Sequence, residues 1–198
     1  MKSGSRGYRQ SARAAATSGN TERIMAAAFE LFIERPFDQI TLPAVAERAG
    51  VGLQTVIRRV GTKDGLVAAV DAWLAPQVAA EGLGAPDDSD PAHVAAAFRR
   101  HYDKWAAAIE RTLTQADSSP ALAANAESGR AAHREWLATA FADALASSPD
   151  PDLLRGRLVA VTGVELWLVL TRHEGLTPDQ AEQTLRTLIT ATLHEGQS

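Results

Sequence analysis

The stretch TERIMAAAFELFIERPFDQITLPAVAERAGVGLQTVIRRVGTKDGL, residues 21–66, decides how this chain of 198 residues is interpreted. It contains three short segments with apolar residues at helical spacing, and Gly50 lies between the second and the third. Two helices joined by a sharp turn that contains glycine form a helix-turn-helix, whose second helix enters the major groove of DNA. The stretch therefore predicts a DNA-binding domain.

Capping residues and a proline delimit these helices. Asn20 or Thr21 caps the first helix, which ends before Pro36. Thr41 caps the second helix, and the glycine of the turn permits the positive φ that a sharp reversal requires. The third helix covers roughly residues 52–60 and is the predicted recognition helix.

The side chains of the recognition helix suit DNA contacts. Gln54 is the best base reader, because its amide can pair with adenine through two hydrogen bonds. Three neighbours have the chemistry for phosphate contacts or, for arginine, guanine: Thr55, Arg58 and Arg59. Thr62 caps a fourth helix, and the free N–H groups of that helix together with Lys63 predict a phosphate clamp.

The charge is unevenly distributed along the chain. The net charge is −4, but residues 1–63 carry ten Lys and Arg against five acids, a net of +5, and the remainder carries −9. A basic DNA reader attached to an acidic body has this asymmetry. Residues 1–19 are rich in Ser, Gly and Arg without an apolar period, which predicts a flexible basic arm that enters a minor groove or remains a solvated tail.

Residues 21–66 resemble the DNA-binding domain of the TetR family of bacterial transcriptional regulators. The resemblance is carried by the following residues: Ala27, Ala28, Leu31 and Phe32 in the first helix, Thr41, the turn at residues 49–51, Thr55, and Lys63 followed by an acid and Leu66. It implies phosphate contacts from Thr41, Thr55 and Lys63, and base contacts near Gly52, Leu53 and Gln54.

The chain departs from the family pattern where DNA contacts are expected. The family usually has an aromatic-rich run where this chain has residues 57–60, so Ile57 replaces an aromatic residue that normally touches a phosphate. Arg58 and Arg59 can supply that contact with charge instead. The preference for a particular operator is therefore not inherited from the family.

From residue 67 onward the pattern is helical throughout, so the predicted fold class is all-α. A helix-turn-helix domain over residues 20–66 is followed by a larger helical ligand-binding and dimerisation domain over residues 67–198. After the fourth helix, which runs to about Val78, the expected helices span 91–116, 120–146 with a break near Ser128–Gly129, 151–173 and 178–194.

The last two helices predict a homodimer through residues 151–195. The resemblance implies that they pair with a second subunit as a four-helix bundle, and their broad apolar content would be hard to cover in a monomer. Two recognition helices spaced by about one turn of DNA (~34 Å) would then read a palindrome. The alternative is that both helices complete a monomeric core.

Aromatic and histidine side chains at helical spacing predict a pocket for a small apolar or aromatic effector. The candidates are Trp73, Phe98, His101, Tyr102, Trp105, His133, Trp136 and Trp167. Core packing is the alternative for each. Glu165, an acid within a largely apolar helix, either faces this pocket, points to solvent or pairs with an arginine.

Several classes of protein are disfavoured. The chain has no Cys, no histidine pair at the spacing of two ligands on one helix, and no catalytic motif, so we expect neither a metal nor a cofactor, and no enzyme. No apolar run approaches a membrane span, which predicts a cytoplasmic protein.

The function expected from these patterns is a homodimeric, ligand-responsive repressor that binds double-stranded DNA at a palindromic operator. One alternative is an all-α small-molecule-binding or enzymatic protein that keeps the helix-turn-helix only as structure. Another is a regulator without an inducer, whose body serves only to dimerise.

Overall fold

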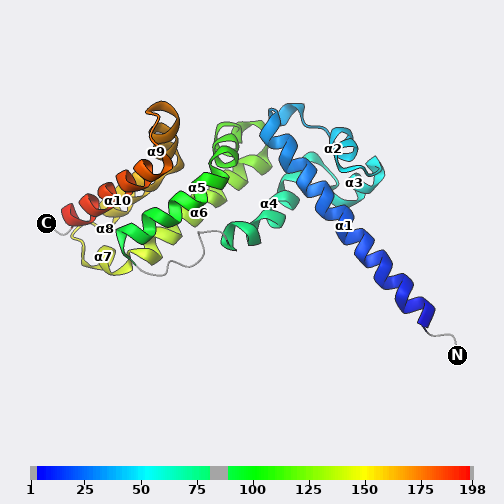
Figure 1. The fold of residues 1–198 in the computed structure, drawn as a ribbon, viewed down its shortest axis with the longest axis horizontal. Helices are drawn as coiled ribbons and strands as arrows, with labels where there is room; N and C mark the ends of the chain where they lie inside the picture. The colour runs from blue at the N-terminus through cyan, green and yellow to red at the C-terminus, as the bar shows by residue number, and fades with distance from the viewer. Residues whose placement is uncertain (1–3, 81–88, 197–198) are drawn as a thin grey trace.

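The computed structural model describes residues 4–80 and 89–196, with side chains described from Gly19 onward. Within these ranges the chain is helical and contains no strand, so the all-α prediction is confirmed. The molecule is elongated, with the first helices at one end and α8–α10 at the other (Figure 1). None of the helices within the described ranges combines the length and apolar character of a membrane span.

The head comprises α1–α3 and the first turns of α4. Its elements are α1 (Gly4–Glu34), the 3₁₀ turn η1 (Phe37–Gln39), α2 (Leu42–Ala49), α3 (Leu53–Val60) and α4 (Lys63–Ala80). The body consists of α5 (Pro91–Thr114), η2 (Ala116–Ser118), α6 (Pro120–Ala140), α7 (Ala142–Ser147), α8 (Pro151–Thr162), α9 (Val164–Leu168), the π-helical turn η3 (Val169–His173) and α10 (Pro178–Glu195).

The first helix differs from its prediction. α1 begins at Gly4, so residues 4–19 continue the helix where the sequence predicted a flexible arm; residues 1–3 lie outside the described range. The alanine run at residues 14–16 has high helix propensity, which explains why the helix extends through this segment. As a result α1 projects beyond the other helices of the head (Figure 1).

The head has a small core of its own. Ile24, Leu31, Val45 and Val56 come from three different helices and are almost completely buried. The chain then turns tightly between α3 and α4. A Cβ atom at Gly65 would overlap the carbonyl oxygen of Val60, so this close approach requires glycine.

The body packs α5 between α6, α9 and α10 (Figure 1). Phe98 and Leu137 are completely buried where α5 meets α6, and Leu158, Leu185 and Ile189 extend the same core into α8 and α10. Arg99 on α5 forms ion pairs with α10, to Glu182 at 2.9 Å and to Asp179. The C-terminal helix is therefore part of the monomer's core.

Two predicted long helices are interrupted at unexpected places. The segment 120–146 is unbroken at Ser128–Gly129, and breaks instead at Phe141, which is almost completely buried. The segment 151–173 breaks at Gly163, whose backbone is extended (ψ 151°). The Tyr102 hydroxyl donates to the Thr162 carbonyl oxygen at 2.6 Å and so satisfies a buried group beside this break.

Head and body are joined by specific contacts. The backbone N–H of Phe37 in η1 donates to Gln115 Oε1 at 2.7 Å, at the end of α5. The Ser119 hydroxyl, which caps α6, donates to Asp64 Oδ1 at 2.8 Å. Leu122 of α6 is buried within the core of the head. The two predicted domains therefore share a bonded and packed boundary.

Candidate DNA-binding surface and ligand cavity

The turn between α2 and α3 has the geometry of a helix-turn-helix. The Thr41 hydroxyl accepts from the Ala44 N–H at 3.2 Å and caps α2. Gly50 ends the helix in the left-handed region (φ 64°), and the Val51 N–H donates to the Ala46 carbonyl at 3.0 Å. The chain reverses here as the sequence predicted, and α3 is presented at the surface.

One face of α3 is buried and the other is open. Val56 and Val60 are buried in the head. Thr55 is half-buried, while the other predicted reading residues of this helix are exposed: Gly52, Leu53, Gln54, Arg58 and Arg59. At 100° per residue, Gln54 and Arg58 lie opposite the buried face, and Leu53 and Ile57 lie on the flank between the buried face and these two residues. Gly52 provides the N-terminal cap position of the helix.

Lys63 is the first residue of α4 and lies against an aromatic ring. Its Nζ is 4.1 Å from the centroid of Phe37, a cation–π contact. Burial lowers the pKa of this ammonium, while Asp38 and Asp64 act in the opposite direction. The Thr62 hydroxyl accepts from the Gly65 N–H at 3.0 Å, so the cap predicted for α4 is present. The contact with Phe37 places this cation beside the N-terminus of a helix.

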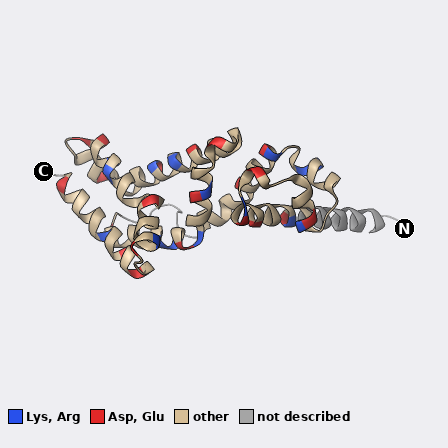
Figure 2. Ribbon diagram, turned by 90° about the horizontal axis from the view of Figure 1, so that it is seen from above, with Lys and Arg blue, Asp and Glu red and all other residues tan. Residues whose placement is uncertain are grey.

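The basic residues of the head are not equally available. Figure 2 shows acidic residues among the basic ones of the head. Arg48 is held by Glu34 at 2.7 Å and by Glu30 at 3.3 Å, which raises its pKa. Within the described residues, no ion pair holds Arg58 or Arg59. The charge that faces outward from α3 therefore comes from these two arginines.

A cavity of about 650 Å³ lies between head and body. Its walls come from α1, η1, α4, α5, α6, α8 and α9. Seven of the nine predicted pocket residues line it: Phe98, His101, Tyr102, Trp105, His133, Trp136 and Glu165. The His133 and Trp136 rings pack T-shaped against the Phe98 ring at centroid distances of 5.3 and 5.1 Å, so these side chains form one aromatic wall.

Two predicted pocket residues lie outside the cavity wall. Trp167 is buried in the core of the body, with its ring 5.8 Å from that of Tyr102. Trp73 packs against the core of the head. Helical spacing alone does not reveal these positions, because they depend on how the helices pack against one another.

The sequence also missed lining residues from the head. Phe29 and Phe32 of α1, Phe37 of η1, and a stripe of α4 that includes Leu66 and Val70 complete the cavity. In the sequence these residues have only the periodicity of a helical core. The rings of Phe29 and Trp105 are packed T-shaped with their centroids 6.0 Å apart, and this contact joins α1 to α5 in the cavity wall.

The polar groups of the wall include two histidines. His133 Nε2 is 2.9 Å from Thr162 Oγ1, whose own proton goes to the Leu158 carbonyl at 2.7 Å, so His133 donates through Nε2. Burial lowers the pKa of both His101 and His133 to about 4. Among the described residues, His101 Nδ1 and Trp105 Nε1 are buried without a hydrogen-bond partner.

Glu165 lies exposed at the edge of the cavity. Its charge raises the pKa of Tyr102, after the larger effect of burial, and partly offsets the effect of burial at His133. Because the carboxylate acts on both rings and remains open to solvent, two of the three predicted environments, pocket and solvent, apply together.

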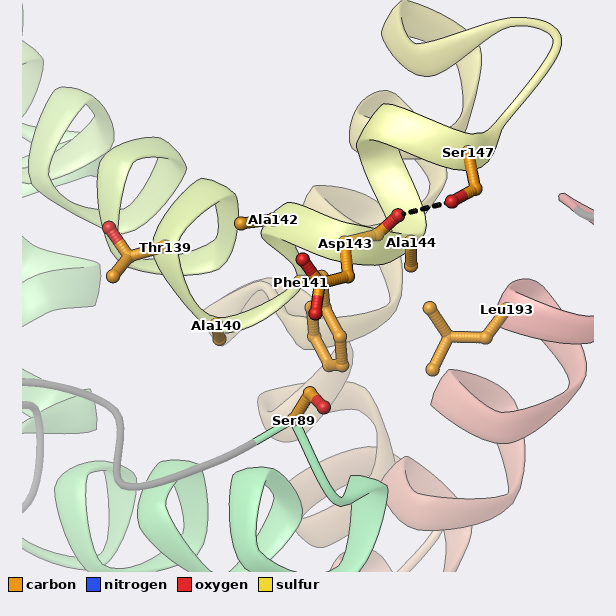
Figure 3. Close-up of a pocket in the computed structure, with 9 residues that line it drawn as sticks. All are labelled: Ser89, Thr139, Ala140, Phe141, Ala142, Asp143, Ala144, Ser147 and Leu193. Atoms are coloured by element: carbon orange, nitrogen blue, oxygen red, sulfur yellow. Dashed lines mark hydrogen bonds between the residues drawn. The ribbon is translucent and has the colours of Figure 1, made fainter.

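A second hollow of about 380 Å³ lies at the opposite end of the body. Figure 3 shows Thr139, Phe141 and Asp143 around it, with Leu193 of α10 on the facing side. It contains none of the predicted site residues. Within the described ranges, no group of three or more His, Asp or Glu is placed to hold a metal ion.

Much of the apolar content of the predicted dimerisation segment is buried within the monomer. Leu154, Leu158, Leu185 and Ile189 belong to the body's own core. Two large apolar side chains of this segment remain exposed, Leu153 (50%) on α8 and Val169 (43%) on η3. The segment therefore completes the monomeric core and still presents an apolar surface.

Comparison with protein families supports the resemblance noted in the sequence. Residues 24–70 match the family of bacterial regulatory proteins called the tetR family. A comparison with curated protein sequences finds no significant match. The predicted relationship to the TetR family is confirmed over the head.

Solved structures share the fold of nearly the whole chain. A transcriptional regulator from Rhodococcus sp. is 22% identical with a TM-score of 0.72, covering 90% of this chain and 98% of its own. A TetR-family transcriptional regulator from Mesorhizobium loti is 18% identical with a TM-score of 0.65, covering 90% and 97%. The flavonoid-responsive regulator FrrA is 21% identical with a TM-score of 0.61, covering 89% and 96%.

Proposed function

We propose that this chain, whose residues 24–70 match the tetR family of bacterial regulatory proteins, is a homodimeric, ligand-responsive repressor of a palindromic operator. The single observation that carries the proposal is the shared wall of the cavity. Residues of the DNA-binding head and residues of the body enclose the same space, so a ligand there contacts both parts. A DNA operator also implies action in the cytoplasm.

The exposed face of α3 supports direct reading of bases. Gln54 suits adenine, and Arg58 suits guanine or a phosphate. We assign phosphate contacts to Thr41, Thr55 and Lys63, where capping positions bring polar groups near the N-termini of α2 and α4. Arg59 adds charge on the side of α3 that carries Thr55.

Dimerisation is supported by the exposed apolar side chains of α8 and η3. Leu153 and Val169 belong to the segment that the family resemblance assigns to the subunit interface. A second copy that covered them would remove apolar surface from water at both positions in each subunit. The two heads would then face successive major grooves of one duplex.

The cavity suits an uncharged, largely aromatic effector. Phe98, Trp105 and Trp136 offer ring faces and edges, and the two histidines of the wall are neutral near pH 7 because burial lowers their pKa to about 4. The fold neighbour FrrA is described as flavonoid-responsive. Flavonoids are therefore the first compounds to test.

Signal transfer would run through α4. This helix begins at Lys63 and lines the cavity from Leu66 to Ala79. A ligand that displaces the middle of the helix also moves its first turn, and with it the spacing of the two heads. Binding to DNA would weaken through a change in the population of competent dimers.

Fluorescence anisotropy tests this function. The full chain is titrated onto the duplex upstream of its own coding region, onto a pool of random duplexes and onto a scrambled control, at two salt concentrations. Tight, sequence-dependent binding of two protomers per site, weakened by a flavonoid that also quenches tryptophan fluorescence, supports the proposal. Arg58→Ala should weaken this binding. Arg100→Ala, on the exposed surface of the body, is the matched control and should leave it unchanged.

The outcomes also separate the alternatives. Weak binding to every duplex with a flat salt dependence would favour a small-molecule-binding or enzymatic protein that keeps the helix-turn-helix only as structure. Specific DNA binding that no flavonoid or other neutral aromatic compound alters would favour a regulator whose body serves only to dimerise.

A further inference from the structure

Large exposed apolar side chains are few in this molecule and fall in two places. Among the described residues they are Leu53 and Ile57 on α3, each 37% exposed, and Leu153 and Val169 on α8 and η3. The second pair belongs to the segment assigned to dimerisation. The first pair lies on the helix that faces DNA, where polar side chains are expected.

Leu53 and Ile57 form one strip. They are four residues apart, so their side chains lie on the same side of α3 about one turn from each other. The neighbouring strip, also four residues apart, is Gln54 and Arg58, which points away from the head. The apolar strip therefore flanks the outward polar strip, on the side between it and the buried face of α3.

Major-groove chemistry supplies an apolar partner of the right size. Thymine carries a C5-methyl group in the major groove, and it is the only apolar group that the four bases present there. Gln54 suits adenine, whose partner base is thymine. A helix that reads adenine through Gln54 therefore has thymine methyl groups within the same or the adjacent base pair.

We propose that Leu53 and Ile57 are specificity-determining residues that contact thymine methyl groups, so that each operator half-site contains A·T pairs beneath the N-terminal half of α3. This inference rests on the proposed DNA-binding function. It adds to that function which base pairs α3 prefers. Leu53 makes the main contact, because the N-terminal residues of a recognition helix approach the bases most closely.

A protein partner fits this strip less well. The strip consists of two side chains, whereas stable protein interfaces bury far larger surfaces. It also borders Gln54 and Arg58, whose exposed polar groups suit a nucleic acid edge. Ile57 stands where the family usually carries an aromatic residue that touches a phosphate, so the contact proposed here belongs to this chain.

Deoxyuridine provides the test, because it lacks only the methyl group of thymine. A high-affinity duplex is first selected from the random pool with the wild-type chain, and each thymine of a half-site is then replaced by deoxyuridine. We expect at least one position at which the loss of the methyl group weakens binding about fourfold, as one buried methyl-sized group predicts.

A double-mutant cycle assigns the contact. Leu53→Ala should weaken binding to the thymine duplex by several fold and leave binding to the matching deoxyuridine duplex nearly unchanged, and Ile57→Ala should do the same at a neighbouring position. Arg100→Ala, on the exposed surface of the body, should leave the affinity for both duplexes, and therefore their ratio, unaltered. Circular dichroism confirms that each variant is folded.

The outcomes distinguish this inference from the proposed function. If the wild-type chain selects no duplex, the DNA-binding function itself fails. If it selects a specific duplex whose deoxyuridine versions bind as tightly as the thymine version, the methyl contact is overturned while the DNA-binding function stands. Equal losses of Leu53→Ala on both duplexes would overturn it as well.

Discussion

The hydroxyl of Ser119 donates to the carboxylate of Asp64 across 2.8 Å, and this bond joins the N-terminal cap of α6 to the first turn of α4. Asp64 directly follows Lys63, the residue assigned to a DNA phosphate. One end of the bond therefore lies at the DNA-binding surface, and the other belongs to a helix that lines the cavity.

A double-mutant cycle should detect this bond. Asp64→Ala and Ser119→Ala should show a coupling in the free energy of unfolding of about 1 kcal/mol, since a hydrogen bond to a charged group joins them. Ser119→Ala alone should cost more than Asp64→Ala, because it also removes the cap of α6. Urea unfolding gives all four values. Asp117→Ala, an exposed acid in η2, should show no coupling with Ser119→Ala.

Stability should decrease in mildly acidic solution. The folded chain keeps His101 neutral down to its pKa of about 4, while the unfolded chain takes up a proton near the ordinary value of 6.5. Between these values the unfolded state binds more protons, so the free energy of unfolding falls as the pH falls, by about 3 kcal/mol at most from this residue. His133 acts in the same direction.

Urea midpoints measured between pH 7 and pH 4.5 check this dependence. His101→Gln should reduce the slope against pH, whereas His173→Gln should not, because the His173 side chain is exposed. A slope unaffected by His101→Gln would contradict the assignment of the effect to this ring.

Gly65→Ala should destabilise the head. The added methyl group would overlap the Val60 carbonyl oxygen, so the turn between α3 and α4 must open, at a cost of about 2 kcal/mol or more. Gly129→Ala on α6 is the matched control, because nothing lies within 4 Å of its added Cβ. Thermal unfolding should show a lower midpoint for the first variant and an equal or higher midpoint for the second.

Removal of the Lys63 charge should weaken DNA binding without changing its sequence preference. Lys63→Met keeps a chain that can pack on Phe37 but loses the ammonium, so affinity should fall by a similar factor on specific and random duplexes. The slope of log affinity against log salt concentration should become shallower by about one unit per protomer, because one fewer counterion is released. A loss confined to the specific duplex would instead assign Lys63 to base reading.

Charge at the exposed apolar residues of the body should separate the subunits. Leu153→Asp combined with Val169→Asp is expected to give the 21.0 kDa mass of a single chain by light scattering, whereas the wild-type chain gives twice that mass. Leu53→Asp, which alters an exposed leucine on α3, should remain dimeric. A wild-type chain that is monomeric at high concentration would contradict the proposed assembly.

The sequence predicted most of the fold because its signals are local. Thr41, Gly50 and Thr62 act within a few residues of themselves, and each occupies the capping or turn position expected of it. The break at Gly163 was not predicted, because it depends on partners distant in the sequence: Tyr102 satisfies the carbonyl released there. The burial of Trp167 in the core of the body was missed for a similar reason, because it depends on contacts with residues distant in the sequence such as Tyr102.

The candidate sites divide in the same way. Exposure of the predicted residues on α3 followed from the period of one helix, because Val56 and Val60 fix which side is buried. The cavity required the packing of α1 and α4 against α5, which no local pattern records. Phe29 and Phe32 were therefore missed as lining residues, although they lie within residues 21–66.

Because head and body share the wall of the cavity, the two parts cannot be exchanged freely between regulators of this kind. Phe29, Phe32 and Phe37 from the head line the cavity together with residues of the body, and Leu122 from the body lies in the core of the head. A chimaera that joined this head to a foreign body would lose part of its own core together with one side of the cavity wall. New pairings of operator and inducer are therefore reached more readily by substitutions within one intact chain than by exchange of modules.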